Sequence, residues 1–276
     1  MYHHKITDWD NAYTNGANIP GGERWPDAWA APAKAYRDER VSAGKAELSL
    51  SYGDRPRNRF DLFLPDAEPK GLVVFVHGGY WMRFDQSFWS HLAKGSVAQG
   101  YAVAMPTYTL CPENRISGIA TEIAAAVEKL ARLTGGPIHL AGHSAGGHLV
   151  TRLVCTDVPL SEAVRSRIRN VVSISGLHDL RPLLRTAMKE TLRIDHAEAI
   201  AESPVFLEPL ESVRVTCWVG GGERAEFIRH SKLLANVWTG VNGATLYVEE
   251  PDRHHFNVID GLADPAHPLT QTLLAD

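Results

Sequence analysis

Cysteine is scarce in this chain, and the three cysteines present, Cys111, Cys155 and Cys217, are odd in number and far apart. The sequence contains no Cys-x-x-Cys pair, so it indicates neither a disulfide framework nor a structural zinc site. The first sixteen residues, MYHHKITDWDNAYTNG, have no apolar stretch of the kind that a secretion signal carries. We therefore expect a cytoplasmic protein with reduced thiols.

Long apolar runs and blocks of basic residues are also missing. The most apolar segment, residues 72–76, is far shorter than the roughly 20 residues that cross a bilayer as a helix. Lys and Arg number 28 against 32 Asp and Glu, and they are dispersed along the chain. We therefore expect neither a membrane nor a nucleic acid as a partner. A hydrophobic content of 44% excludes a disordered chain.

From residue 46 onward, short β-branched runs alternate with segments of helical character. Eight runs predict strands, at residues 46–52, 59–64, 72–76, 101–105, 138–140, 171–174, 213–219 and 245–248. A turn-rich stretch joins the first two strands, which predicts an antiparallel hairpin. The later alternation of strands and helices is typical of an α/β protein whose mostly parallel sheet is covered by helices on both faces.

The clearest helix pattern lies between the fourth and fifth predicted strands. The apolar residues that share its buried face are Ile119, Ile123, Val127, Leu130 and Leu133. Gly135, Gly136 and Pro137 follow and end the helix before the next strand.

The first 45 residues differ from the rest of the chain in their aromatic content. They contain Trp9, Trp25 and Trp29, three of the seven tryptophans, and residues 25–40 could form a helix. We interpret residues 1–45 as an N-terminal arm and residues 46–276 as a single domain. The arm either only packs its aromatic side chains on this domain or also covers a ligand pocket.

Residues 142–146 read GHSAG and follow the predicted strand 138–140. A helix-like segment comes next, so the motif lies in the strand–turn–helix context that a G-x-S-x-G nucleophile elbow requires. Small residues beside the serine let the strand and the helix approach closely around a strained backbone. We therefore predict that Ser144 is a nucleophile and that its hydroxyl projects above the sheet, at a helix N-terminus.

Residues 77–81 read HGGYW and directly follow the apolar strand 72–76. Glycines at such a position let backbone N–H groups turn toward one point, as in the HGGG-type loops that form an oxyanion hole. We assign the donors of this hole to the backbone N–H groups of Gly79 and Tyr80, with a third from Ala145.

A serine nucleophile needs a base, and hydrolases with this strand–turn–helix elbow carry their triad in the chain order Ser, Asp or Glu, His. Adjacent histidines, His254 and His255, follow the last predicted strand. Neighbours in a loop point in different directions, and we predict His255 as the base. His143 and His148 are interpreted as structural or pocket-lining residues.

The acid that orients the base has several candidates. Glu223 follows the strand 213–219 and fits the required order, so we predict it as the third member of the triad. Asp179 follows the strand 171–174 and is the main rival, although it could instead anchor a loop. Glu226 and Asp252 also lie near the predicted site in the sequence.

Two further patterns, one rich in glycine and one in histidine, do not indicate a cofactor or metal site. Residues 220–225 read GGGERA, but they lie in the last βα unit, whereas a dinucleotide site is expected at the first. The thirteen histidines include no H-E-x-x-H pattern, and no P-loop occurs. We expect no cofactor and no metal.

Four segments together resemble a known family: HGGYW at 77–81, GHSAGGHL at 142–149, GGGERAEFIRHS at 220–231 and HHF at 254–256. They are similar to segments of the α/β-hydrolase kynurenine formamidases and of bacterial relatives described as esterases. The resemblance implies the α/β-hydrolase fold and a triad on Ser144, Glu223 and His255. The family normally has Asp where this chain has Glu223, and related esterases have a third glycine where it has Tyr80.

The resemblance also implies an activity, namely hydrolysis of a small formyl or acyl amide or ester, with N-formylated arylamines such as N-formylkynurenine as the leading substrates. A pocket for such a substrate would use Trp81, Phe84 and His143, together with the tryptophans of the N-terminal arm. A short-chain carboxylesterase is the main alternative, and a non-catalytic ligand-binding hydrolase fold is a remote one. The resemblance further allows a homodimer.

Overall fold

The structure is a computed structural model that describes residues 5–275, so the first four residues of the predicted arm lie outside the described range. Within that range eight strands form one sheet: β1 (Ala46–Ser51), β2 (Arg59–Phe63), β3 (Leu72–Val76), β4 (Ala102–Pro106), β5 (Ile138–His143), β6 (Ile168–Ile174), β7 (Arg214–Gly220) and β8 (Ala244–Glu250). The helices of the same range are α1 (Trp9–Tyr13), α2 (Trp25–Ser42), α3 (Ala93–Ala98), α4 (Ile116–Leu130), α5 (Ala145–Leu153), α6 (Glu162–Arg165), α7 (Lys189–Leu192), α8 (His196–Ala201), α9 (Ala225–Thr239) and α10 (Pro268–Leu274).

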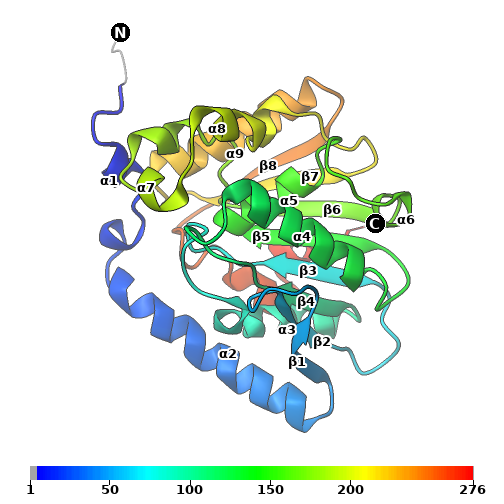
Figure 1. The fold of residues 1–276 in the computed structure, drawn as a ribbon. Coiled ribbons are helices and arrows are strands. Elements are labelled where there is room, and N and C mark those ends of the chain that lie inside the picture. The colour runs from blue at the N-terminus through cyan, green and yellow to red at the C-terminus, as the bar shows by residue number, and fades with distance from the viewer. Residues whose placement is uncertain (1–4, 276) are drawn as a thin grey trace.

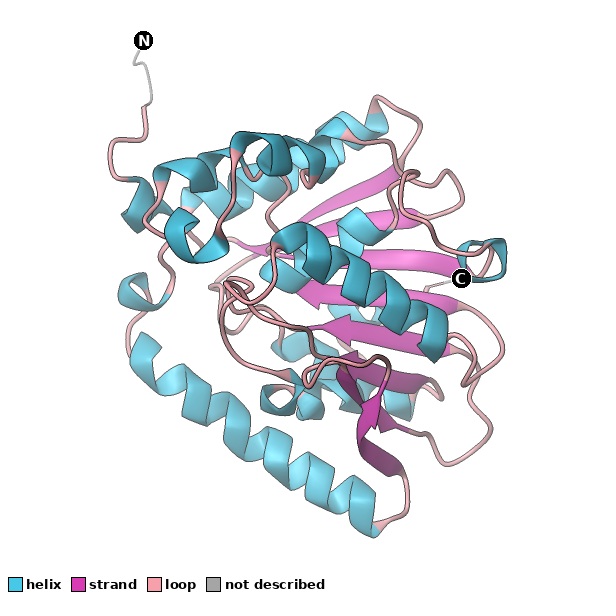
Figure 2. Cartoon of the chain, viewed as in Figure 1, coloured by secondary structure: helices cyan, strands magenta, loops and turns pink. Residues whose placement is uncertain are grey.

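The strand order across the sheet is β1-β2-β4-β3-β5-β6-β7-β8. Strand β2 is antiparallel to both of its neighbours, and all other pairs are parallel. The prediction of a mostly parallel, eight-stranded sheet is therefore confirmed. Figure 2 shows the arrowheads of the parallel strands pointing toward the side along which the N-terminal segment runs.

Helices cover both faces of the sheet, as the alternating sequence pattern predicts (Figure 1). One core cluster joins α4, α5 and α9 to the sheet, through residues such as Ile119, Val150 and Phe227. A second cluster, on the other face, includes Val97 of α3 and Leu273 of α10. Strands β3 and β4 are buried along their whole length, which explains their continuous apolar runs. No helix within residues 5–275 is long and apolar enough to cross a membrane.

Helix α4 corrects one detail of the sequence interpretation. Ile119, Ile123, Val127 and Leu130 are buried on one face as expected. Leu133 is not, because the helix ends at Leu130 and leaves this side chain 43% exposed in the following turn.

The described part of the arm lies against the domain. The helix predicted at residues 25–40 is α2, and Pro26 stands in its first turn, where the missing N–H costs no intrahelical hydrogen bond. The Trp29 and Trp89 ring centroids are 5.3 Å apart, and those of Tyr36 and Phe63 are 5.4 Å apart. The aromatic residues of α2 therefore pack into the second core cluster.

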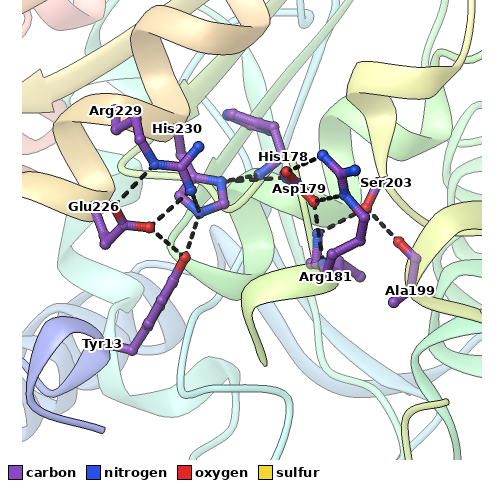
Figure 3. A network of polar contacts seen from close by, with 10 residues as sticks. Tyr13, His178, Asp179, Arg181, Ala199, Ser203, Glu226, Arg229 and His230 are labelled. Atoms are coloured by element: carbon purple, nitrogen blue, oxygen red, sulfur yellow. Dashed lines mark hydrogen bonds and ion pairs between the residues drawn. The ribbon is translucent and has the colours of Figure 1, made fainter. Parts of the chain in front are cut away.

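Tyr13, at the end of α1, anchors the other half of the arm to helix α9 (Figure 3). Its hydroxyl donates to Glu226 Oε2 at 2.7 Å and lies 2.8 Å from His230 Nε2. His230 Nδ1 accepts the backbone N–H groups of His178 and Asp179, so the ring carries its proton on Nε2 and donates it to Tyr13. Burial lowers the pKa of His230 to about 3, which keeps this ring neutral.

The Tyr13→Phe variant should unfold with a free energy about 1–3 kcal/mol lower, because a buried His230 N–H and a buried Glu226 oxygen each lose a partner. Urea unfolding measures this loss. Tyr36→Phe is the matched control, because Tyr36 lies in the same arm. Burial and nearby charges account for the raised pKa of its hydroxyl, and no hydrogen bond contributes to that shift. Equal losses in the two variants would contradict the anchoring role.

Candidate active site

The backbone turns sharply at Ser144, between β5 and α5. Ser144 has φ 56° and ψ −116°, a conformation that few non-glycine residues adopt. A Cβ on Gly146 would lie 1.9 Å from the Val76 carbonyl oxygen, so only glycine lets α5 approach β3 this closely. Gly142 is required likewise, because its Cβ would lie 2.2 Å from the Gly146 carbonyl oxygen. The GHSAG segment therefore has the strand–turn–helix geometry that its sequence predicts.

Glu223 and His255 meet at the carboxyl ends of β7 and β8. His255 Nδ1 lies 2.6 Å from Glu223 Oε2, and both side chains are almost fully buried, at 4% and 0% exposure. The carboxylate accepts, so Nδ1 carries the proton and Nε2 remains able to accept another. Glu223 Oε1 accepts from the Ser175 hydroxyl and from the Gly220 N–H at 2.9 Å, which holds the carboxylate in one orientation.

The rival acid, Asp179, has a different partner. Arg181 donates to both of its carboxylate oxygens, at 2.9 and 2.8 Å (Figure 3). Burial raises the pKa of the Asp179 carboxyl, but the hydrogen bonds from Arg181 outweigh it and hold the pKa below its usual value. Asp179 thus anchors the loop that follows β6.

A cavity of about 630 Å³ opens beside these residues. Ser144 and His255 both line it, as do Gly79, Tyr80 and the predicted pocket residues Phe84 and His143. Nine of the twenty described residues that line it belong to the arm, between Asp10 and Trp29. Aromatic rings make up much of the wall, which suits a flat apolar ligand with one reactive polar group.

Trp81 is a correction to the predicted pocket. Its side chain is 1% exposed and packs edge-on against the His148 ring, with centroids 5.2 Å apart. It does not line the cavity. The backbone turns at Tyr80 and Trp81, with φ 55° and 58°, so the tryptophan points into the core while the tyrosine faces the cavity.

The loop 77–81 offers free backbone donors. Within residues 5–275, the N–H groups of Gly79 and Tyr80 donate no hydrogen bond. Ala145 is the first residue of α5, where no intrahelical acceptor exists for its N–H. The predicted donors Gly79, Tyr80 and Ala145 therefore keep their N–H groups available for an anionic oxygen.

The remaining histidines of the site are structural in their contacts. His143 Nε2 lies 2.8 Å from the His255 carbonyl oxygen and donates to it, and burial holds the pKa of His143 well below its usual value. His148 Nε2 donates to the Glu202 carbonyl oxygen. His254 packs edge-on against Trp25 of the arm, at 5.1 Å between centroids, and is not among the described residues that line the cavity beside His255.

Sequence reasoning missed Ser175 and Tyr13. Ser175 directly follows β6, so its position at the carboxyl end of a parallel strand was a usable signal. Tyr13 carried no comparable signal, because its partners on α9 lie more than 200 residues away in the sequence. In the described part of the chain, no group of three His, Cys, Asp or Glu side chains could hold a metal ion.

Residues 73–255 of the chain match the model of a protein family that is described as "alpha/beta hydrolase fold". The kynurenine formamidase of Salmo salar is 27% identical over 239 residues, covering 82% of this chain and 80% of the relative. This similarity confirms the resemblance that the motifs indicate.

Solved structures extend the comparison. A candidate thioesterase from Silicibacter sp. TM1040 superposes with a TM-score of 0.91 at 51% identity, covering 97% of this chain and 99% of that one. Esterase B from Lactobacillus rhamnosis superposes with a TM-score of 0.66 at 18% identity, covering 89% of this chain and 91% of that one. The latter likeness concerns the fold alone.

Replacing Glu223 by Gln should slow the labelling of Ser144 by a fluorophosphonate by about 10³- to 10⁴-fold, because the amide stabilises the wrong tautomer of His255. Intact-mass spectrometry over time measures the rate. Asp179→Asn, the matched control, should label at nearly the parent rate. If Asp179→Asn were the slow variant, Glu223 would be the wrong acid.

Proposed function

Because the chain belongs to the alpha/beta hydrolase fold family, we propose that it is a serine hydrolase that removes a small formyl or acyl group from an aromatic amine, in the manner of a kynurenine formamidase. The observation that carries the proposal is the buried Glu223–His255 hydrogen bond beside Ser144, at an aromatic cavity. The formamidase relatives, which match over most of their length, favour a formyl amide as substrate.

In the proposed reaction, His255 Nε2 takes the proton from the Ser144 hydroxyl as the oxygen attacks the substrate carbonyl. The negative charge that develops on the carbonyl oxygen is stabilised by the N–H groups of Gly79, Tyr80 and Ala145. His255 then gives its proton to the leaving amine, and a formyl or acyl group stays on Ser144. Water, activated by the same histidine, releases the acid. Throughout, Glu223 holds the imidazole in the reactive tautomer.

The arm supports an aromatic substrate. Trp29 and Phe84 line the cavity and lie edge-to-face, with centroids 6.2 Å apart. Phe256 also lines the cavity and packs on Trp29 at 5.1 Å. These rings offer flat apolar surface to an aromatic leaving group, which is the part of the substrate that distinguishes arylamides from simple aliphatic amides.

A carboxylesterase or thioesterase is the second candidate function, because the Silicibacter candidate thioesterase is 51% identical over almost the whole chain. The same catalytic groups serve esters, thioesters and amides. The two candidate functions therefore differ in the leaving group and in the size of the acyl group of the substrate. A non-catalytic role would leave the paired Glu223 and His255 and the free N–H groups without a purpose.

We also propose a cytoplasmic location and a small-molecule substrate. Cys111, Cys155 and Cys217 are all buried and unpaired, and burial raises the pKa of each thiol to about 12. Inert, reduced thiols suit a reducing compartment. Pairing as a homodimer stays a prediction.

N-formylkynurenine should be hydrolysed with a kcat/KM at least about tenfold above those of p-nitrophenyl butyrate and an acetyl thioester, a preference of about 1.4 kcal/mol in transition-state binding. Parallel steady-state assays on one preparation measure the three values. Ser144→Ala is the control and should abolish all three activities. A formamide rate far below the ester or thioester rate would replace the proposed function by the second candidate.

A further inference from the structure

The side chain of Tyr80 connects the proposed oxyanion loop to the arm. Its hydroxyl accepts the backbone N–H of Asn15 at 3.2 Å and the Asn15 side-chain Nδ2 at 3.2 Å. The same hydroxyl donates to the Tyr13 carbonyl oxygen at 3.1 Å. All three hydrogen bonds of this hydroxyl therefore go to residues 13–15, and Asn15 itself is only 1% exposed.

The loop around Tyr80 needs external support. Gly79, Tyr80 and Trp81 have φ values of 109°, 55° and 58°, and left-handed conformations at non-glycine residues cost roughly 1–3 kcal/mol each unless the surroundings impose them. The two ends of the loop are held from the domain: His77 binds Thr107 at 3.0 Å, and the Trp81 carbonyl accepts the Cys111 N–H. The Gly79 carbonyl accepts the N–H groups of Met82 and Arg83, at 3.0 and 2.9 Å, and so closes the turn around Tyr80 from within the loop. Within residues 5–275, the hydrogen bonds that hold Tyr80 from outside the loop are those of its hydroxyl.

The arm can supply this support because it is itself anchored. Two residues before Asn15, Tyr13 is bound to Glu226 and His230 of α9 (Figure 3). Helix α9 also carries Phe227, whose ring centroid lies 4.4 Å from that of His255. The arm thus ties the proposed oxyanion loop to the same helix that packs against the proposed base.

We propose that Asn15 is a positioning residue for hydrolysis: by holding the Tyr80 hydroxyl, it keeps the N–H groups of Gly79 and Tyr80 aimed at the developing oxyanion. This inference rests on the proposed function and gives the arm a catalytic part beyond lining the cavity. Asn15 is not among the described residues that line the cavity. It acts on the transition state, because misplaced donors lose stabilisation of the oxyanion without losing ground-state contacts.

The test is a double-mutant cycle with Asn15→Ala and Tyr80→Phe, assayed on the best of the three substrates above. Tyr80→Phe keeps the ring in the cavity wall and keeps the backbone N–H. Each single variant should lower kcat roughly tenfold with KM nearly unchanged, less than the 10²–10³ lost with a whole oxyanion donor. The double variant should be no slower than Tyr80→Phe alone, because losing the Tyr80 hydroxyl already removes the hydrogen bond from Asn15 Nδ2 that Asn15→Ala removes.

A trifluoromethyl ketone inhibitor supplies a readout that a merely structural role would not move. It forms a tetrahedral adduct with the serine, so its affinity should fall by the same factor as kcat in both variants. Asn11→Ala is the matched control, because Asn11 is exposed and, among residues 5–275, its side chain binds only Asn18. This control should keep the parent kcat and inhibitor affinity.

Three results would overturn the proposal: an unchanged kcat in Tyr80→Phe, additive losses in the double variant, or a loss in KM alone. Tyr80→Phe removes a single oxygen atom, so it tests the proposal even where Asn15→Ala fails to fold. Failure of the proposed serine-hydrolase activity looks different, since Ser144 would then resist the fluorophosphonate and the parent protein would hydrolyse none of the three substrates.

Discussion

The sharp backbone turn at Ser144 positions most of the other groups of the site. Its φ of 56° and ψ of −116° exist because Gly142 and Gly146 let β5, α5 and β3 approach within distances that no Cβ would allow. The contact of Gly146 with the Val76 carbonyl also brings the end of β3 beside the start of α5. One backbone conformation therefore places the serine, the first N–H of a helix and the loop 77–81 in the same neighbourhood.

Parallel strands supply the other groups. Ser144, Ser175 and Glu223 follow β5, β6 and β7, and His255 follows β8, so all four lie at the carboxyl edge of the sheet. Two rival candidates for the triad are engaged by other partners. Asp179 is occupied by Arg181, and His254 packs on Trp25 of the arm. The arm then forms part of the cavity wall. It is itself anchored by the buried hydrogen bonds of Tyr13 to Glu226 and His230, which are costly to break because the buried polar groups would lose their partners.

Much of the fold was predictable because its signals are local. Strand runs, the glycines of the elbow and the proline at the start of α2 act through neighbours a few residues away, and the structure has all eight predicted strands. Where the prediction failed, the reason was also physical. Leu133 continues the apolar period of α4 but lies beyond the end of the helix. Trp81 belongs to a loop whose positive φ values turn its side chain into the core. The spacing of apolar residues in the sequence does not predict such a turn.

The amino-acid pattern was enough to predict the α/β class, the elbow serine and the order of the candidate triad, because each depends on spacing and on residue types at strand ends. Two contacts are visible only in the folded chain: Glu223, and not Asp179, meets His255, and residues 13–15 of the arm hold Tyr80. Those contacts join segments between 32 and 67 residues apart. Their geometry follows from how the finished core orients each loop, so no local pattern records it.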